Sequence, residues 1–461
     1  MLSDITISRI IEAAMGTTAD FAEVFEEEKK ASNVGLLNKR TIRAASGIHY
    51  GVGIRLMSGT NVVYVYTSDK SEEALIKLAK EAASAIKGGK AADIKQVEAL
   101  SKSSPSILEI DPLTVSKKDN ISFLKEASEY AMSYNELITQ VAASYVTSNR
   151  VIHVVNSEGI NKEESQTRIR LSIETVATKG TEKQTGRVAP GTMRGYEFVN
   201  EYPVIEKTRE CCDTAIRMVN AGYAPSGKMP VIIGNGFGGV IFHEACGHAL
   251  ESTAVGIKSS CFTDKLGKQI ASSIVSARDN ARIEGEWGSY MTDDTGRESS
   301  DLLLIENGIC RNYLVDDLGA RRMGCEPTGC GRRQDFTYAP TSRMSNTYID
   351  NGKDDPKDII ADTEYGLYCT KMGGGSVDTA TGEFNFAAEE AFMIRNGKIA
   401  EPVRGATLIG KGQEILMNID RVGNNLELAA GMCGSISGGV PVTVGQPTIR
   451  VSSILVGGRE A

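Results

Sequence analysis

The sequence predicts an α+β fold, in which N-terminal helix-plus-antiparallel-sheet units precede a β-rich C-terminal domain that carries one short histidine-bearing helix. The 461 residues exceed what one ordinary core accommodates, which favours two or three domains. Helix and strand patterns alternate along the first half of the chain, whereas strand patterns dominate the second half. The segments SKSSPSILEIDP and APSGKMP separate the expected domains, which are 1–100, 105–223 and 224–461.

The first expected domain combines two helices with antiparallel strands. Its opening residues place Ile7, Ile10 and Ile11 at helical spacing, which predicts an amphipathic helix rather than a signal peptide. Residues 34–69 carry β-branched and aromatic side chains broken by Gly and Ser-Gly turns, as antiparallel strands do. The stretch SEEALIKLAKEAASAIKGG then has an acidic first turn and apolar positions at helical spacing, so it predicts a second helix.

The second and third expected domains show their own local signals. Ser116 and Asp119 could form a capping box that begins a helix. From about residue 139 to 202 the pattern returns to strands, for example in ASYVTSNRVIHVVNSEG and TRIRLSIETVAT. In the third expected domain, the Asn-Gly pairs at 307–308 and 396–397 lie between apolar runs and predict hairpin turns.

Composition and charge argue against several classes of protein. The formal net charge of −8 does not provide the clustered basic surface that nucleic-acid binding requires. No apolar run is long enough to cross a bilayer. Nine cysteines without a compact disulfide pattern fit a reducing compartment. We therefore expect a cytoplasmic globular protein with no nucleic-acid or membrane partner.

The segment GNGFGGVIFHEACGHALES, residues 234–252, holds two of the four histidines of the chain. A zinc peptidase helix normally reads H-E-x-x-H, with its histidines four residues apart on one face. His243 and His248 are five apart, and on a regular α-helix such positions point roughly 140° away from each other. A π-type insertion of one residue would return them to a common face. Gly247 would ease that distortion because it has no Cβ.

The same segment allows other interpretations. Gly234, Gly236 and Gly239 satisfy G-x-G-x-x-G after a strand-like segment, which is the pattern of a dinucleotide-binding site. However, no convincing buried strand with an acidic residue follows about 20 residues later, and 48 glycines make a chance match easy. His243 and His248 could also be two core histidines on different faces. We favour a metal site because an acidic residue adjoins one of these two histidines.

Several blocks of the sequence resemble the TldD/PmbA family of zinc metallopeptidases. They are HEACGHALE, ADFAEVFEEE and GVGIRLMSG, PTGCGRRQDFTYAPTSRMSNTY at 327–348, and GMCGSISGGVPVTVGQPTIRVSSILVGG at 431–458. These blocks keep their order over nearly the whole chain. The TldD-like branch of the family carries two histidines, a glutamate and a late cysteine, which the PmbA-like (TldE) branch lacks. This chain has all four, so it resembles the catalytic TldD-type subunit.

The resemblance implies a catalytic Zn2+ held by His243, His248 and Cys433. It also implies that Glu244 takes a proton from the water that zinc activates and delivers it to the leaving amine. From spacing alone, Glu251 would be an equally good third ligand. The expected function is therefore zinc-dependent hydrolysis of peptide bonds in flexible or unfolded peptides.

Substrate contacts and partners are indicated less directly. Arg343, in the block at 327–348, could orient a substrate. Gly373 and Gly374 leave a backbone bare of side chains, along which an extended peptide could lie; alternatively, they form a bulged turn. Cys246 is interpreted as a small buried thiol rather than a ligand. Because members of the family form dimers, the resemblance implies pairing either with a PmbA-like (TldE) subunit or with a second copy.

Two hypotheses of other classes remain. The first is a non-catalytic scaffold or binding subunit whose metal is structural; such a site needs no base, so Glu244 would be dispensable. The second is a dinucleotide-binding oxidoreductase that uses Gly234, Gly236 and Gly239, and it would require binding of a nicotinamide cofactor.

Overall fold

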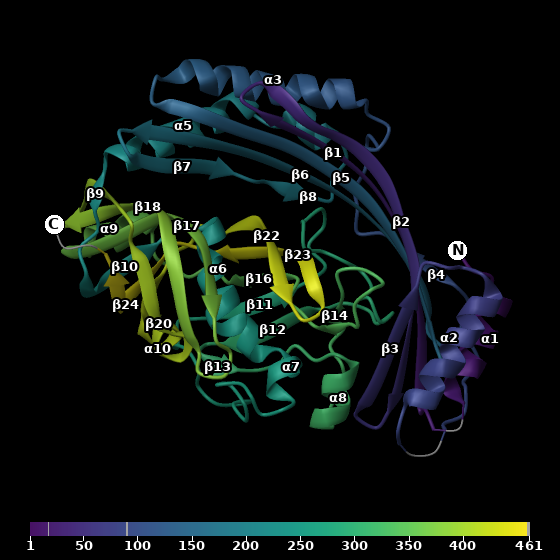
Figure 1. Cartoon of the computed structure of the whole chain (residues 1–461). Helices are drawn as coiled ribbons and strands as arrows, with labels where there is room; N and C mark the ends of the chain where they lie inside the picture. The colour runs from purple at the N-terminus through teal and green to yellow at the C-terminus, as the bar shows by residue number, and fades with distance from the viewer. Residues whose placement is uncertain (17, 89–90, 459–461) are drawn as a thin grey trace.

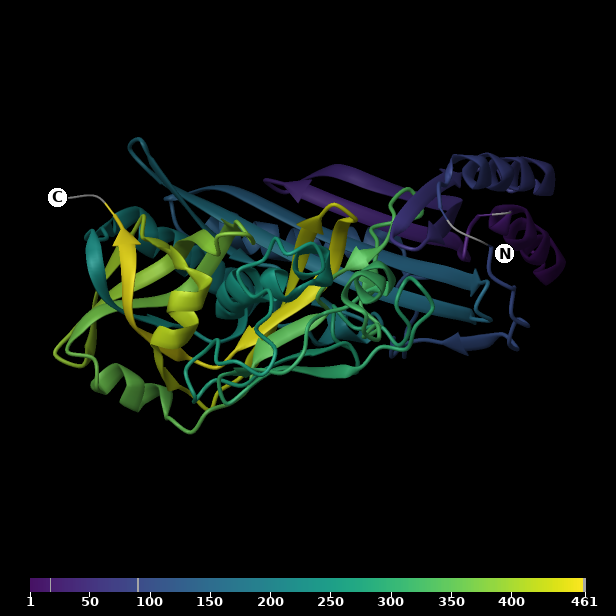
Figure 2. The ribbon, with the colours of Figure 1, turned by 90° about the horizontal axis from the view of Figure 1, so that it is seen from below.

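The structure is a computed structural model that describes residues 1–16, 18–88 and 91–458. It confirms the predicted α+β class, with a long curved sheet that arches over a C-terminal unit (Figure 1). Seen from below, the C-terminal unit lies along this sheet (Figure 2). The barrel of the C-terminal unit lies at one end of the molecule, and the N-terminal helices α1 and α2 lie at the other end.

The long sheet contains strands from both expected N-terminal domains. Its order is β3-β2-β1-β5-β6-β4, and β7 and β8 also pair with β6. β1 joins the two parts, since it pairs with β2 on one side and with β5 on the other. The strands are β1 (Phe21–Leu37), β2 (Arg40–Ser58), β3 (Asn61–Thr67), β4 (Ser101–Ser103), β5 (Ile138–Asn156), β6 (Asn161–Lys179), β7 (Glu182–Val188) and β8 (Gly191–Thr192). The boundary between the two expected domains stays a prediction.

Helices cover the outer face of this sheet at both of its ends (Figure 1). The predicted first helix is confirmed, because Ile7, Ile10 and Ile11 are buried along one side of it. The predicted cap is confirmed as well, since the Ser116 hydroxyl accepts a hydrogen bond from the Asp119 N–H. The helices are α1 (Asp4–Met15), α2 (Glu72–Ala85), α3 (Lys117–Tyr134), α4 (Glu197–Glu201) and α5 (Val204–Asn220).

Strand β1 begins well before the predicted strand region at 34–69. Its first part contains Glu23, Glu26 and Glu27, and all three side chains are 0% exposed. In a half-buried strand, apolar residues normally occupy the buried positions. Here acidic residues occupy them, which is rare unless they have partners, so the sequence does not show the strand pattern in this stretch. Glu23 and Glu27 pair with arginines, and Glu26 accepts hydrogen bonds from the Tyr50 hydroxyl and the Leu2 N–H.

Ion pairs of Arg55 and Glu23 join the long sheet to the C-terminal unit. The Arg55 guanidinium contacts Glu23 within the sheet and Asp317 in the C-terminal unit, the latter at 2.6 Å. Arg333 reaches back from the C-terminal unit to Glu23 at 2.7 Å. These contacts fix the C-terminal unit against the inner face of the arch.

In the C-terminal unit, one sheet closes into a five-stranded barrel. β10 pairs with β17 and β24, β20 pairs with β24 and β18, and the pairing of β18 with β17 completes the ring. β9, β19 and β21 extend or flank it. The strands are β9 (Gly222–Tyr223), β10 (Gly227–Ile233), β17 (Tyr365–Val377), β18 (Glu383–Arg395), β19 (Lys398–Arg404), β20 (Thr407–Lys411), β21 (Ile419–Val422) and β24 (Ile449–Gly457).

A six-stranded sheet of order β13-β12-β11-β16-β23-β22 completes the unit, with a two-stranded sheet of β14 and β15. The predicted Asn-Gly turns at 307–308 and 396–397 are confirmed, because all four residues have positive φ and connect β12 to β13 and β18 to β19. The strands are β11 (Ala277–Asn280), β12 (Asp301–Glu306), β13 (Ile309–Cys310), β14 (Gly331–Arg332), β15 (Thr341–Ser342), β16 (Asn346–Ile349), β22 (Glu427–Ser435) and β23 (Gly438–Gln446).

The remaining helices of the C-terminal unit are short: α7 (Ser252–Val255), α8 (Asp317–Met323), α9 (Pro356–Ala361) and α10 (Gly412–Asn418). Within the described part of the chain, no helix has both the length and the apolar character needed to cross a membrane.

Candidate metal centre

A short helical segment carries the two central histidines and follows β10 directly. It consists of η1 (Gly236–Gly239), α6 (Val240–Phe242), η2 (His243–Gly247) and η3 (His248–Leu250). A Cβ on Gly239 would lie 2.5 Å from the backbone of Gly445 in β23, and one on Gly238 would lie 2.8 Å from the Gln446 side chain. These glycines therefore allow the segment to pack closely on β23.

The predicted π-type turn is present at His243–Gly247, where the His248 N–H bonds to the His243 carbonyl. It brings the two imidazoles together, with ring centroids 5.1 Å apart and planes at 83°. Gly247 has ordinary helical angles, φ −54° and ψ −54°, so the turn does not need glycine for its conformation. Space is the reason instead, because a Cβ there would lie 2.0 Å from the Met344 sulfur.

The third side chain of the cluster comes from the β22–β23 hairpin. Cys433 in β22 pairs with Val440 in β23 and is 3% exposed. Its Sγ lies 3.2 Å from Nε2 of His243 and 3.1 Å from Nε2 of His248. One ligand atom from each of these three residues lies within 4.8 Å of the others. The structure thus brings together the three residues that the resemblance indicates as metal ligands.

The three side chains are electrostatically complementary. Burial raises the pKa of the Cys433 thiol, but the two imidazoles outweigh burial and bring that pKa well below its usual value. Burial lowers the pKa of His248, whereas the Glu251 carboxylate and the Cys433 sulfur together raise it well above its usual value. A thiolate and an imidazolium therefore stabilise each other, and a metal ion would have to displace the imidazolium proton.

The donor set and its spacing fit zinc. Two imidazoles and one thiolate give the three protein ligands typical of a catalytic zinc site. Bonds of about 2.3 Å to sulfur and about 2.0–2.1 Å to nitrogen, at a tetrahedral angle, place the two donors about 3.5 Å apart. The observed separations of 3.1 and 3.2 Å are slightly shorter, so a small side-chain adjustment suffices. Sulfur and imidazole donors also disfavour hard cations such as Mg²⁺ or Ca²⁺.

Glu244 lies beside the cluster and is not one of its three donors. Its Oε2 is 3.8 Å from Nε2 of His248, and its side chain is 21% exposed. Burial raises the pKa of Glu244, while the imidazoles of His243 and His248 act to lower it. Among the described residues, no hydrogen bond holds this carboxylate. The carboxylate thus lies near the cluster without being committed to a hydrogen bond.

Glu251, which spacing alone made a possible ligand, lies behind His248. Its Oε2 is 3.1 Å from Nδ1 of His248, and its side chain is 5% exposed. This hydrogen bond directs Nε2 of His248 toward Cys433. Such a carboxylate–histidine contact is the usual support of a metal-binding imidazole.

Arg343, expected to orient a substrate, is 0% exposed and lies behind the hairpin. Its guanidinium donates hydrogen bonds to the carbonyls of Cys433 at 2.6 Å and Gly438 at 2.8 Å, and to the Ser437 hydroxyl at 3.0 Å. These donors are occupied by the hairpin, so a direct contact with substrate would require their release.

Gly373 and Gly374 lie in β17, where pairing with β18 is irregular. The register shifts twice between Lys371 and Gly375, so the segment is a bulged strand. A Cβ on Gly374 would meet nothing within 4 Å. Among the described residues, β10 pairs only with the earlier part of β17, so the second edge of 371–377 has no strand partner.

The dinucleotide interpretation lacks its second strand. Both neighbours of β10 come from later in the chain, and the strand that follows the helical segment, β11, belongs to the six-stranded sheet. Within the described ranges, no βαβ unit therefore forms around Gly234, Gly236 and Gly239. Cys246 is fully buried, and burial raises its pKa well above the usual value, which fits a packing thiol.

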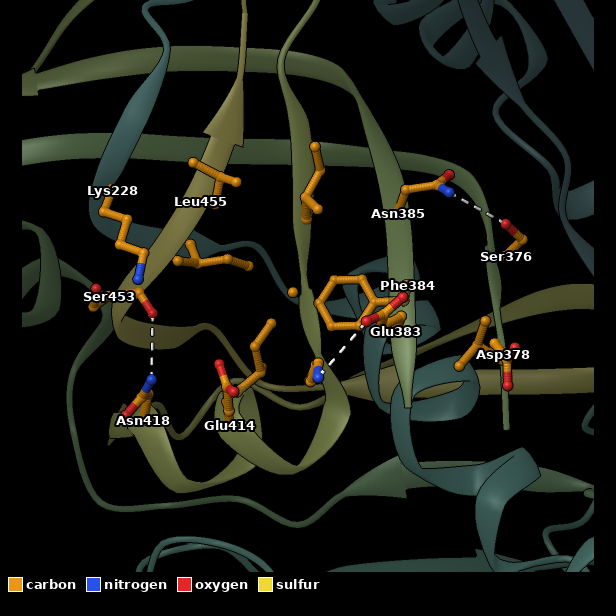
Figure 3. Close-up of a pocket in the computed structure, with 16 residues that line it drawn as sticks. Lys228, Ser376, Asp378, Glu383, Phe384, Asn385, Glu414, Asn418, Ser453 and Leu455 are labelled. Carbon is orange, nitrogen blue, oxygen red and sulfur yellow. Dashed lines mark hydrogen bonds and ion pairs between the residues drawn. The ribbon is translucent and has the colours of Figure 1, made fainter. Parts of the chain in front are cut away.

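A cavity of about 750 Å³ lies elsewhere, between barrel strands and α10 (Figure 3). Lys228, Glu383 and Glu414 are among its charged residues, while Phe384 and Leu455 contribute apolar surface. None of the cluster residues lines it, and its mixed charges do not indicate one class of ligand.

Sequence reasoning missed the other residues that hold the hairpin. Trp287 Nε1 donates to the Gly431 carbonyl at 2.8 Å, and Arg170 donates from the long sheet to the Ala430 carbonyl at 3.1 Å. No local pattern marks either residue. The only available signal was that Trp287 is the single tryptophan of the chain.

Comparison with known proteins identifies the class of protein to which this fold and cluster belong. Three family models match the chain: PmbA/TldA metallopeptidase domain 1 at 22–86, the central domain at 110–219 and the C-terminal domain at 226–458. A metalloprotease TldD homolog of Haemophilus influenzae is 32% identical, with 99% of this chain and 97% of that protein covered. Another from Buchnera aphidicola is 33% identical, with 88% and 86% covered. The chain belongs to the PmbA/TldD metallopeptidase family.

Solved structures share the same fold. A candidate modulator of DNA gyrase from Bacteroides thetaiotaomicron has a TM-score of 0.79 at 18% identity, with 100% of both chains covered. TldE from Thermococcus kodakarensis has a TM-score of 0.76 at 17% identity, with 98% of this chain and 99% of that chain covered. At these identities the likeness is one of fold.

Proposed function

We propose that this protein is a zinc-dependent metallopeptidase that hydrolyses peptide bonds in flexible or unfolded peptides. The observation that carries the proposal is the cluster of His243, His248 and Cys433, with the Glu244 carboxylate beside it. Relatives about 32% identical over nearly the full chain are named metalloproteases, which supports the same class of activity.

The residues of the chain would divide the chemistry between them. His243 and His248 would hold the metal through Nε2, and Cys433 would hold it through Sγ. Zinc, when bound, would polarise the scissile carbonyl and lower the pKa of water at the site. Glu244 would accept a proton from the attacking water and return it to the leaving amine nitrogen. Its raised pKa suits this role, because the protonated form must persist long enough to act as an acid.

The substrate would bind as an extended strand along the unpaired edge of β17. Gly373 and Gly374 carry no side chains that would block the approach of another backbone, and β17 packs against η2. Main-chain hydrogen bonds of this kind do not depend on sequence, and a folded protein does not present a free strand. The preference for flexible peptides follows from both facts.

We further infer that the chain works as a dimer, either with a PmbA-like (TldE) subunit or with a second copy. The likeness in fold to a TldE protein supports the first form, since two subunits of one fold can pair about a pseudo-twofold axis. Light scattering of the chain alone and of its mixture with a TldE-type protein distinguishes the two forms.

The variant Glu244→Gln tests the proposal. It keeps the shape of the side chain and removes its basicity, so we expect peptide hydrolysis to fall by about 10²–10⁴-fold while one zinc still binds. The measurements are zinc stoichiometry and cleavage of an unfolded fluorogenic peptide. A variant with unchanged turnover would contradict the assigned role, and so would a wild-type chain that binds no zinc. If wild type binds zinc but never cleaves peptides, the scaffold hypothesis replaces the proposal.

A further inference from the structure

Arg343 is a fully buried cation without a carboxylate partner. No Asp or Glu oxygen lies within ion-pair distance of its guanidinium among the described residues. Arg333, which is equally buried, differs in this respect because it pairs with Glu23 at 2.7 Å. A buried charge without a paired charge is costly unless its surroundings compensate, so the position of Arg343 requires an explanation.

The surroundings of Arg343 are the turn of the β22–β23 hairpin. Its donors reach the Cys433 carbonyl on one strand, and the Ser437 hydroxyl and Gly438 carbonyl at the turn. Ser437 is itself 0% exposed and accepts a second hydrogen bond from Thr341. One rigid guanidinium therefore bridges both sides of the hairpin, with the sulfur-bearing residue at one end of the bridge.

The hairpin needs such a support because its own sequence is permissive. GMCGSISGG contains four glycines within nine residues, and glycine restricts the backbone least of all residues. The edge of β22 away from β23 carries no further strand within the described ranges. Left alone, such a hairpin would allow the Cys433 sulfur to move relative to the helical segment that carries the two histidines.

We propose that Arg343 is a positioning residue that holds the Cys433 sulfur in register with His243 and His248. The inference rests on the proposed metal centre. The carbonyl that Arg343 binds at 2.6 Å belongs to the residue that carries the sulfur, so the guanidinium fixes the backbone from which the sulfur projects. Arg343 is then part of the support of the site and touches neither metal nor substrate.

The test compares Arg343→Lys and Arg343→Met with wild type in the full chain. Lysine keeps the charge but cannot bridge the hairpin with several donors in fixed geometry, and methionine removes both features. We expect zinc to bind about 10–100-fold more weakly in each variant. Competition with a chromophoric chelator gives the affinity. Cobalt substitution gives a second readout, because the thiolate-to-cobalt absorption band should weaken when the sulfur is misplaced.

Arg333→Lys is the matched control, since among the described residues this equally buried arginine makes no hydrogen bond to the hairpin. It should lower thermal stability while leaving zinc affinity and the cobalt band at wild-type values. If Arg343→Met fails to fold, Arg343→Lys and the milder Ser437→Ala decide whether Arg343 positions Cys433. Ser437→Ala removes one of the three acceptors, so it should weaken zinc binding by a smaller factor.

Folded Arg343 variants with wild-type zinc affinity and an unchanged cobalt band would overturn the inference and leave the proposed function intact. Equal losses in the Arg333 control would overturn it too, because the effect would then reflect general destabilisation. A wild-type chain that binds neither metal would refute the proposed function itself.

Discussion

At the scale of single residues, the proposed chemistry depends on how His248 is held. Its Nδ1 contacts Glu251 and its Nε2 contacts Cys433, so a negative group lies at each end of the ring. This arrangement favours the protonated imidazole in the metal-free chain, although burial opposes it. A metal ion must therefore compete with a proton for Nε2.

That competition predicts the pH dependence of zinc binding. The pKa of His248 is raised well above its ordinary value, so a proton competes with zinc for this ring over a higher pH range than for an ordinary histidine. Affinity should rise with pH by roughly tenfold per unit for each proton released, until the raised pKa is passed. Calorimetry in buffers of different ionisation enthalpy measures the protons released.

Glu251→Gln provides the variant for this prediction. Removing the carboxylate removes the largest influence that raises the pKa of His248, so the pH range of rising affinity should move lower. At high pH the variant should bind zinc about tenfold more weakly, because the imidazole loses its anionic hydrogen-bond partner. Identical pH profiles for the two proteins would show that Glu251 does not act on His248.

Local spacing was sufficient to select His243, Glu244 and His248 from the sequence. Cys433 was different, because 190 residues separate it from His243 and only resemblance to a family indicated it. For Arg343, the sequence suggested a role near substrate, whereas its burial places it behind the hairpin. The direction of a side chain depends on packing among distant segments, which spacing does not encode.

At the scale of elements, the metal centre depends on close contact between the histidine-bearing segment and β23. Gly239 and Gly445 face each other there, and neither position leaves room for a side chain. The π-type turn then rotates His248 toward the same side as His243. Together these two features direct both imidazoles at Cys433.

The variant Gly239→Ala tests the contact. Its added Cβ would lie 2.5 Å from the Gly445 backbone, which cannot move aside as a flexible side chain could. We expect a loss of about 1–3 kcal/mol in the free energy of unfolding and weaker zinc binding, because the segment must shift. Urea unfolding and zinc titration measure the two effects.

Gly222→Ala in β9 is the control, since a Cβ there would meet nothing within 4 Å. It should change stability by less than about 0.5 kcal/mol. Equal stability of the Gly239 and Gly222 variants would mean that the segment does not depend on this contact.

The π-type turn could be predicted because two histidines five residues apart can share a metal only if one residue is inserted. The role of the glycines could not be predicted in this way. Gly234, Gly236 and Gly239 match a dinucleotide-binding motif in the sequence. Only the structure, in which β23 packs against Gly239, shows that this glycine allows close packing. For Gly247, the sequence suggested a need for backbone freedom, whereas the structure shows helical backbone angles and a Met344 side chain in the space that a Cβ would need.

At the scale of the whole molecule, buried ion pairs hold the C-terminal unit beneath the arch. Asp317 accepts from Arg55 of the long sheet and from Arg297 of the C-terminal unit itself. Burial raises the pKa of Asp317, but the two arginines outweigh burial and lower it overall. The carboxylate is thus ionised in the folded protein at neutral pH.

The variant Asp317→Asn should therefore be strongly destabilised at neutral pH. It leaves the buried Arg55 partly unpaired, and breaking a buried pair costs about 3–5 kcal/mol. Because the folded pKa is lowered, the contribution of Asp317 is complete above its unfolded value of about 3.9 and declines as pH falls through the folded value. The difference between wild type and variant should shrink in acid.

Urea unfolding at pH 7 and in acid measures this difference, with Asp301→Asn as the control. The Asp301 side chain is 45% exposed in its pair with Arg278, so its loss should cost about 0–1 kcal/mol. A difference for Asp317 that stays constant across this pH range would contradict the electrostatic account of the junction.

The arch itself could not be predicted from sequence. Periodicity located many of its strands, but the buried acids hid the beginning of β1, since Arg333, a partner of Glu23, lies 310 residues away. A local pattern also does not show that strands from two expected domains pair in one sheet. Both features arise from long-range contacts, which leave no mark on a single segment.

X-ray absorption at the zinc edge of the loaded protein tests the central claim most directly. We predict one sulfur at about 2.3 Å and two imidazole nitrogens at about 2.0–2.1 Å from the metal, with the sulfur lost in Cys433→Ser. A wild-type spectrum without sulfur, or a sulfur that persists in Cys433→Ser, would contradict a metal centre built from His243, His248 and Cys433.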